Sequence, residues 1–198
     1  MIATERLRLR QWRDDDRAPF AAMNVDARVM TYFPAPIPKA DSDLFVDVQS
    51  DRIARLGWGG FAVEHENSGA FVGFVGLSEP PSWHPCGGSV EIDRRLAHEH
   101  WGRGYASEAA RASLDACYPL LDRDEIVSLT ASCNRPSRRV MEKLGMRRDA
   151  HGFDHPRIPA GNRLRAHVVY RLSRETWRRA RANVPVQSVS SRGESSSR

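Results

Sequence analysis

The sequence predicts an α+β (mixed α/β) fold, and three observations carry that prediction. Short stretches that alternate apolar and polar residues, such as RLRLR (6–10) and SVEID (89–93), are typical of half-buried strands. The glycine-containing segment GRGYAS (102–107) directly precedes a run with helical periodicity. The expected elements follow in the order β, α, α, β, β, β, α, β, α, β, which differs from the regular alternation of a doubly wound sheet.

The length of the chain allows one domain with a sizeable core. We expect a single domain over residues 1–182 of the 198. After Trp177 the sequence becomes rich in serine and arginine and poor in large apolar side chains. Such a segment cannot bury enough surface to stay ordered, so residues 183–198 are expected to form a disordered tail.

Cysteine spacing and the lack of long apolar runs indicate in which cellular compartment the protein is expected. Cys86, Cys117 and Cys133 fit neither a disulfide framework nor the ligand spacing of a metal site. The opening MIATERLRLR is too charged for a signal peptide. No stretch approaches the ~18 apolar residues of a membrane span. The sequence therefore predicts a cytoplasmic protein with free thiols, no bound metal and no membrane contact.

Helices are expected on both sides of the PAPIP segment at 34–38, which forces a break. Residues 14–33 mix acids with Ala, Met and Val without alternation, which favours a helix. Residues 41–56 have the pattern of a capped helix. Its buried side is expected to carry Leu44, Val48 and either Ile53 or Leu56.

The second half alternates strands and helices. WGGFAVEH (58–65) and AFVGFVGL (70–77) flank the turn sequence ENSG, which predicts a hairpin. IVSLTASC (126–133) and LRAHVVYRL (164–172) alternate as strands do. A short helix is expected over 136–144, with Gly145 just past its end. The helix after the glycines shows a core-facing stripe made of Ala106, Ala110, Leu114, Cys117 and Leu121.

The net charge of +5 favours an acidic partner, which could be nucleic acid, a phosphorylated cofactor or an anionic surface. The arginines are dispersed, however, and most lie beside acids. No basic surface interleaved with aromatic residues is visible, so nucleic acid is disfavoured as a partner.

The glycine segment has the chemistry of a phosphate cradle. Gly102 and Gly104 let the backbone approach a ligand, and the N–H groups that open a helix attract anions. Arg103 adds a full charge. Ser107 occupies the third glycine position of a dinucleotide fingerprint, and the lysine of a P-loop is absent. A pyrophosphate would fit; the alternative is a tight turn without a ligand.

Two segments resemble the GNAT superfamily of acyl-CoA N-acyltransferases. They are EIDRRLAHEHWGRGYASEAA (91–110) and NRPSRRVMEKLGM (134–146). Trp101 stands where most members have Gln or Arg, as is usual in the RimJ/RimL-type branch, whose best-known members acetylate protein N-termini. TERLRLRQW (4–12) and HVVYRLSRETW (167–177) also look like that branch. The resemblance covers about residues 3–178.

The resemblance implies a central, mostly antiparallel sheet with a splayed parallel strand pair, flanked by helices, and acetyl-CoA as cosubstrate. The backbone of Ile92, Asp93 and Arg94 would pair with the pantetheine arm, and its N–H groups would hold the thioester oxygen. The remaining cofactor-binding residues would be Gly102, Arg103, Gly104, Tyr105, Ala106, Ser107, Asn134 and Arg138. The unranked candidates for the 3′-phosphate are Arg94, Arg95, Arg103, Arg138 and Arg139.

The reaction needs a group that accepts the proton of the attacking amine. Glu91 is the expected general base, because it lies mid-strand on the face opposite Val90 and Ile92. It would need partial desolvation, since an exposed Glu titrates near ~4.3. The alternative is a strand carboxylate paired with an arginine.

The leaving thiolate also needs a hydrogen-bond donor. Many GNAT enzymes use a tyrosine, but Met141 stands at that position. RimL-type enzymes have a serine three residues after the asparagine, so the resemblance implies Ser137 as the acid, or a water in its place. The alternatives are a first-turn serine for Ser137 and a plain N-cap for Asn134.

The predicted function is an acetyl-CoA-dependent N-acetyltransferase that acetylates a primary amine, such as a protein N-terminal amine. Acetylation of a small amine, such as an antibiotic or a polyamine, fits the same cofactor site. A non-catalytic acyl-CoA-binding module is the alternative from another class. Family members are often dimers, so a homodimer is one expectation for the assembly.

Overall fold

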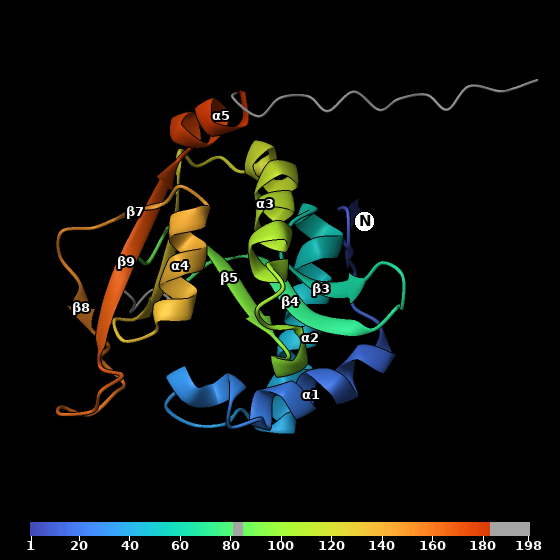
Figure 1. The fold of residues 1–198 in the computed structure, drawn as a ribbon, viewed down its shortest axis with the longest axis horizontal. Helices are drawn as coiled ribbons and strands as arrows, with labels where there is room; N and C mark the ends of the chain where they lie inside the picture. Colours follow the sequence, from blue (N-terminus) through green and yellow to red (C-terminus); the bar gives the residue numbers. More distant parts are fainter. Residues whose placement is uncertain (81–84, 183–198) are drawn as a thin grey trace, which may run out of the picture.

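The structure is a computed structural model that describes residues 1–80 and 85–182. Residues 81–84 and the predicted tail at 183–198 lie outside the described residues. Within the described part, nine strands form a single sheet (Figure 1). The strands are β1 (Ile2–Ala3), β2 (Leu7–Arg10), β3 (Gly60–His65), β4 (Phe71–Ser78), β5 (Val90–Leu96), β6 (Glu125–Ala131), β7 (Arg147–Arg148), β8 (Phe153–Asp154) and β9 (Ala166–Ser173).

The sheet is mixed and mostly antiparallel. Its strand order is β1-β2-β3-β4-β5-β6-β9-β7, with β8 paired to β9. β3 and β4 form the predicted hairpin, with Phe61 opposite Val75. The described pairs are antiparallel except for β5 and β6, which run parallel because α3 connects them. The predicted fold class is therefore confirmed.

Five α-helices of the described residues cover the two faces of this sheet (Figure 1). One core cluster joins Phe20 of α1 and Val46 of α2 to Phe74 of the sheet. The larger cluster joins α3, α4 and α5 to the opposite face. The bounds are α1 (Arg17–Val25), α2 (Lys39–Leu56), α3 (Tyr105–Cys117), α4 (Arg135–Lys143) and α5 (Arg174–Ala182). Short 3-10 turns lie at 14–16, 29–32, 98–100 and 118–120.

The expected stripe on α2 is wrong. Leu44 is 60% exposed and Val48 is 49% exposed, whereas the helix buries Ser42, Val46 and Gln49. Two of these buried residues are polar, and each has a partner from a distant segment. The Nδ2 of Asn24 donates to Ser42 Oγ at 2.8 Å, and the Oε1 of Gln49 accepts from the N–H of Gly60 at 2.7 Å. Because these bonds satisfy the polar groups, the helix can bury Ser42 beside α1 and Gln49 beside β3, on either side of Val46.

Element boundaries differ from the expectation at several places. The expected helix over 14–33 is divided into a 3-10 turn, α1 and a second 3-10 turn, and α2 begins at Lys39 after Pro38. β6 ends at Ala131, so Cys133 is exposed beyond the strand. In α3 the stripe of Ala110, Leu114 and Cys117 is buried as predicted. The C-terminal helix α5 was not among the expected elements.

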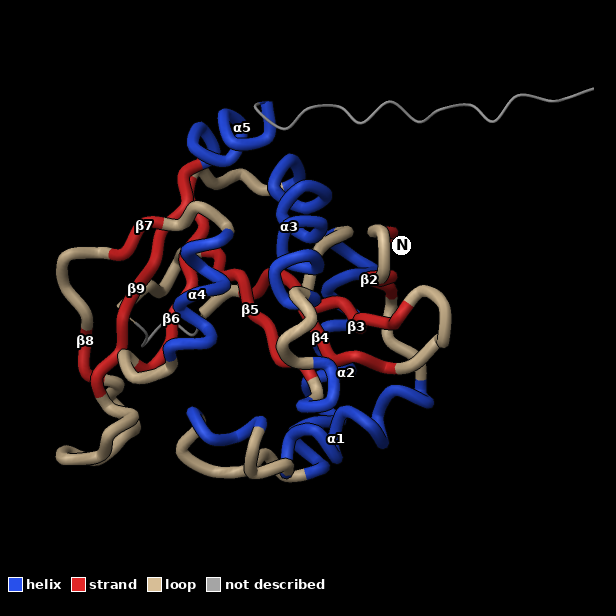
Figure 2. Tube along the Cα trace, viewed as in Figure 1, coloured by secondary structure: helices blue, strands red, loops and turns tan. Residues whose placement is uncertain are grey.

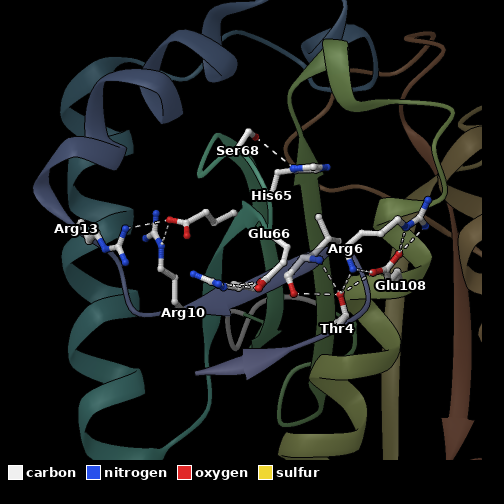
Figure 3. Close-up of polar contacts among 11 residues, drawn as sticks. Thr4, Arg6, Arg10, Arg13, His65, Glu66, Ser68 and Glu108 are labelled. Atoms are coloured by element: carbon white, nitrogen blue, oxygen red, sulfur yellow. Dashed lines mark hydrogen bonds and ion pairs between the residues drawn. The ribbon is translucent and has the colours of Figure 1, made fainter. Parts of the chain in front are cut away.

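A buried ion cluster ties the N-terminal strand to the rest of the sheet. Arg10 of β2 donates to both carboxylate oxygens of Asp16 at 2.7 and 2.9 Å, and its Nε donates to Glu64 of β3 at 2.7 Å. Arg13 reaches the same Glu64 oxygen at 2.9 Å (Figure 3). The arginine and both carboxylates of Asp16 and Glu64 are buried, and hydrogen bonds satisfy their charges.

Candidate active site

The centre of the sheet contains an open backbone edge. The parallel ladder between β5 and β6 has only the pairs Val90–Ile126 and Glu91–Val127, after which the strands diverge (Figure 2). β5 stays paired with β4 as far as Leu96. The carbonyl of Ile92 faces the gap, because it accepts from the Oγ of Ser128 on β6 at 3.0 Å. By the two-residue period of a strand, the backbone of Arg94 faces the same gap.

The glycine loop before α3 presents unpaired N–H groups. Gly102 and Gly104 have φ of 75° and 84°, in the left-handed region that favours glycine. A Cβ on Gly102 would meet nothing within 4 Å, so the backbone is open to a ligand. Among the described residues, the N–H groups from Gly102 to Ala106 make no hydrogen bond, whereas those of Ser107 and Glu108 bond to the Gly104 carbonyl. Free amides at a helix start fit a pyrophosphate.

Glu108 holds this loop against the N-terminal segment. Its carboxylate accepts from the hydroxyl of Thr4 at 2.6 Å and from the backbone N–H of Arg6 at 3.0 Å, as well as from the Arg6 guanidinium (Figure 3). The Arg6 Nη1 donates to the carbonyl of Arg103 at 3.1 Å, and its guanidinium lies 4.8 Å from the ring centre of Tyr105. The loop is thus positioned by residues from the start of the chain.

Glu91 and Asp93 form a half-buried pair of carboxyl groups. They lie two residues apart on β5 and on the same face of the strand, so their charges act on each other. Glu91 Oε1 also accepts from the N–H of Leu129 at 3.2 Å, just where β6 leaves β5. Asp93 accepts from the hydroxyl of Ser78. Burial and the charge of Asp93 raise the pKa of Glu91 well above its usual value.

Arg94 crosses the gap from the other face of β5. Its Nη1 donates to Ser128 Oγ at 3.1 Å, and its Nη2 donates to both the carbonyl and the hydroxyl of Ser137, each at 2.9 Å. Burial lowers the pKa of Arg94 to about 10. The guanidinium therefore links β5, β6 and the first turn of α4, and Ser137 Oγ receives a hydrogen bond while its own proton stays available.

The sequence that forms the splayed strand pair, the glycine loop and the half-buried carboxyl matches a known family. Residues 6–147 match the sequence model of the acetyltransferase (GNAT) domain. The chain belongs to this family. It is therefore an acyltransferase enzyme that depends on acetyl-CoA.

Two relatives come from Bacillus subtilis. YkkB, an uncharacterized protein, is 33% identical over 146 residues, which cover 73% of this chain and 84% of the relative. YnaD, an uncharacterized N-acetyltransferase, is 29% identical over 177 residues, which cover 89% and 98%. Among solved structures, a GNAT-family acetyltransferase from Bacillus anthracis shares 29% identity with a TM-score of 0.69, covering 88% of this chain and 98% of that one.

Two more distant structures share the GNAT fold. Spermidine N-acetyltransferase from Vibrio cholerae, solved with CoA and spermine, has a TM-score of 0.69 at 21% identity and covers 88% of this chain and 99% of its own. RimJ from Mycobacterium smegmatis, solved with CoA-disulfide, has a TM-score of 0.68 at 20% identity and covers 89% and 88%. At these identities the likeness concerns the fold alone.

In this GNAT domain, Asn134 and Arg138 lie at the end of β6 and in α4. Asn134 is the N-cap of α4: its Oδ1 accepts from the N–H of Ser137 at 3.2 Å, and its Nδ2 donates to Thr130 Oγ1 at 2.9 Å. Arg138 donates to the carbonyl of Ser132 at 3.1 Å and approaches the hydroxyl of Tyr170 at 3.4 Å. The structure thus gives Asn134 the capping role that the sequence left as its alternative.

The arginines predicted as candidates for binding the 3′-phosphate of the cofactor do not lie together. Arg103 is exposed on the glycine loop and Arg139 is exposed on α4. Arg95 lies on the opposite face of the sheet from α3, where its Nη1 donates to Asn24 Oδ1 of α1 at 2.6 Å and its guanidinium lies over Phe33. Arg95 is therefore badly placed for a phosphate bound at the glycine loop.

Sequence reasoning missed three polar residues of the site. Ser78, Ser128 and Asn24 hold Asp93, the Ile92 carbonyl and Arg95, respectively. Their strand and helix patterns gave no signal beyond a polar residue at a buried position, because the partners come from other elements. Over residues 1–80 and 85–182 there is no cluster of potential metal ligands, and no helix long and apolar enough to span a membrane.

Proposed function

We propose that this GNAT enzyme transfers the acetyl group of acetyl-CoA to a primary amine by direct attack on the thioester, with Glu91 as the general base. The observation that carries the proposal is the position of Glu91. Its carboxyl is half-buried at the point where β5 and β6 separate, and the N–H of Leu129 orients it. A base there lies beside an acyl group held in the gap.

The cofactor would be seated by backbone groups at two places. The free N–H groups from Gly102 to Ala106 would bind the pyrophosphate, supported by the positive end of α3. The open edge of β5 at Ile92 and Arg94 would pair with the pantetheine arm, as a strand pairs with a sheet edge. The β5 N–H groups at this edge would also stabilise the thioester oxygen as it becomes anionic.

The acid–base chemistry follows from the two carboxyls and from Ser137. The acceptor nitrogen attacks as a neutral amine and then loses a proton to Glu91. A raised pKa makes Glu91 a better base near neutral pH than an exposed carboxylate. The thiolate would accept a hydrogen bond from Ser137, whose Oγ is already held by Arg94. Met141 is fully buried in the core and has no proton to offer.

Two classes of acceptor have support. The WGRGY segment at 101–105 favours the RimJ/RimL branch and a protein N-terminal amine. A small amine is the second candidate, because a spermidine N-acetyltransferase is built on the same fold. One catalytic domain over residues 1–182 serves either class, since the strands of a single sheet run from Ile2 to Ser173.

The decisive experiment is a titration with CoA and acetyl-CoA. We expect calorimetry to show binding and the melting temperature to rise with ligand concentration. At a ligand concentration of 100 times the Kd, the free energy of unfolding should increase by about 2.7 kcal/mol. Thiol release from acetyl-CoA with a panel of primary amines then measures transfer. If CoA neither binds nor raises the melting temperature, the proposed cofactor site is wrong. If it binds but no amine releases thiol, the proposed transfer reaction is wrong.

A further inference from the structure

Arg6 uses all three nitrogens of its guanidinium to join α3 to the glycine loop. Its Nε donates to Glu108 Oε2 at 2.8 Å, its Nη2 donates to the same oxygen, and its Nη1 donates to the carbonyl of Arg103 at 3.1 Å (Figure 3). The other oxygen of Glu108 accepts from the hydroxyl of Thr4 at 2.6 Å and from the backbone N–H of Arg6 at 3.0 Å. We call Thr4, Arg6 and Glu108 the tether.

The bond to Arg103 fixes the direction of one peptide group in the glycine loop. The carbonyl of Arg103 and the N–H of Gly104 belong to the same planar peptide, and the described residues contain no cis peptide. In a trans peptide the C=O and N–H bonds point in opposite directions, so the N–H of Gly104 points away from Arg6. Within the described chain this N–H makes no hydrogen bond. It is therefore already oriented before a ligand arrives.

Hydrogen bonds, and not core packing, hold the loop at Gly104. Residues 101–104 are exposed, and the tether borders a surface cavity of about 480 Å³. Apart from the chain neighbours of Gly104, a Cβ on this residue would meet only Arg6 Nη2 within 4 Å, at 3.6 Å. Glycines have wide conformational freedom when nothing holds them. Without the tether, a ligand would have to order the loop at a cost in affinity.

The charge of Glu108 opposes the binding of an anion nearby. Burial acts against this charge, but the hydrogen bonds from Thr4 and Arg6 lower the pKa of Glu108 below its ordinary value. Glu108 is therefore ionised at neutral pH. A carboxylate in the first turn of a helix stabilises that helix, yet it repels a pyrophosphate bound at the same end. A benefit of Glu108 to cofactor binding must therefore come from position and not from charge.

We propose that Arg6 and Glu108 are positioning residues that set the affinity for CoA, because they hold the N–H of Gly104 in the direction of the pyrophosphate. This inference rests on the proposed function and adds the segment 4–6 to the cofactor site. Thr4 contributes by fixing the carboxylate that in turn fixes Arg6. Neither charged residue has to touch the reacting atoms.

The test uses two variants that change the charge in opposite directions. Arg6→Gln removes a positive charge and Glu108→Gln removes a negative one, so a purely electrostatic role predicts weaker CoA binding for the first and tighter binding for the second. The tether predicts that both raise the Kd for CoA by about 10-fold, because a hydrogen-bond donor loses its position. Arg6→Lys keeps the charge but lacks the planar fork, so it should weaken binding nearly as much as Arg6→Gln. Calorimetry gives each Kd.

Arg8→Gln and Glu66→Gln are the matched controls. This pair lies two residues further along β2, is also joined by two hydrogen bonds, and has no recorded contact with the glycine loop. Both controls should leave the Kd for CoA within about 2-fold. Thr4→Val removes one bond of the tether without changing any charge, and should raise the Kd by about 3-fold. It serves if Arg6→Gln or Glu108→Gln fails to fold.

Kinetics separate positioning from general damage to the fold. In the Arg6→Gln and Glu108→Gln variants, KM for acetyl-CoA should rise with the Kd, whereas kcat should change by less than about 3-fold. Transfer from acetylpantetheine, which lacks the pyrophosphate, should be affected by less than about 3-fold in kcat/KM. An equal loss with acetylpantetheine and with acetyl-CoA would contradict a role directed at the pyrophosphate.

Two binding results would also overturn the inference. Glu108→Gln that binds CoA as well as the unchanged protein, or better, would show that the carboxylate does not position the loop. Arg6→Lys that binds CoA like the unchanged protein would leave only the charge of Arg6. In these cases the unchanged enzyme still binds CoA and transfers acetyl groups, so the proposed function stands. If the unchanged protein does not bind CoA, the proposed function and this inference are both wrong.

Discussion

At the scale of single residues, the Glu91 carboxyl couples activity to stability. Its pKa is raised in the folded chain, mainly by burial and then by Asp93, so the folded state holds this proton more tightly than the unfolded state does. The protonated form therefore stabilises the fold at low pH. That stability is lost as the pH rises from the unfolded pKa through the folded one, which is where the base becomes active.

Glu91→Gln should separate these two effects. We expect kcat to fall by about 100-fold, because the proton acceptor is gone, while the Kd for acetyl-CoA changes little. The neutral amide should also raise the melting temperature above that of the unchanged protein at about pH 8, since no charge has to be buried. Turnover at saturating acceptor and thermal melts check both. An unchanged rate would remove Glu91 from the mechanism.

Asp93→Asn tests the origin of the raised pKa. The change removes the neighbouring negative charge but keeps a group that can accept from Ser78. The pKa of Glu91 should fall, so the acidic limb of kcat/KM should move to lower pH. The same acceptor is used for both proteins, because its own amine titrates on the alkaline side. If the acidic limb of kcat/KM stays at the same pH, Asp93 does not raise the pKa of Glu91.

At the scale of elements, α2 gives a direct comparison between the buried and exposed sides of one helix. Val46 is 2% exposed and packs against the sheet, whereas Val48 points outward. We expect Val46→Ala to lower the free energy of unfolding by about 2 kcal/mol through lost burial and a cavity, and Val48→Ala by less than about 0.5 kcal/mol. Urea denaturation of both variants measures the difference. Equal losses of stability in the two variants would mean that the side of α2 carrying Val48 is buried, as the sequence predicted.

The same helix shows where prediction from sequence ends. The strands with clear alternation, the hairpin and the glycine loop were predictable, because each depends on a local pattern. The stripe on α2 was not, because Ser42 and Gln49 are buried through partners at Asn24 and Gly60. In the site, alternation put Glu91 and Asp93 on the face opposite Ile92. It could not show how strongly burial raises the pKa of Glu91 or that Arg94 reaches Ser137, since both depend on elements distant in sequence.

At the scale of the whole molecule, the buried ion cluster around Arg10 ties the first strands to the rest of the sheet. Arg10→Met leaves the carboxylate of Asp16 buried without its partner, so we expect a loss of about 3–5 kcal/mol. Arg8→Met is the matched control on the same strand, since the Arg8–Glu66 pair is partly exposed and its loss should cost little stability. Urea unfolding gives both values. A loss for Arg10→Met no larger than that for Arg8→Met would contradict this account.

The gap between β5 and β6 also affects how the protein behaves in storage. A free backbone edge invites strands of other molecules to pair with it, and here the edge lies in the middle of a sheet, where charged border residues cannot shield it. The pantetheine arm of CoA would cover that edge. We therefore expect the purified enzyme to aggregate more slowly when CoA is present, even well below its unfolding temperature, as light scattering over days would show.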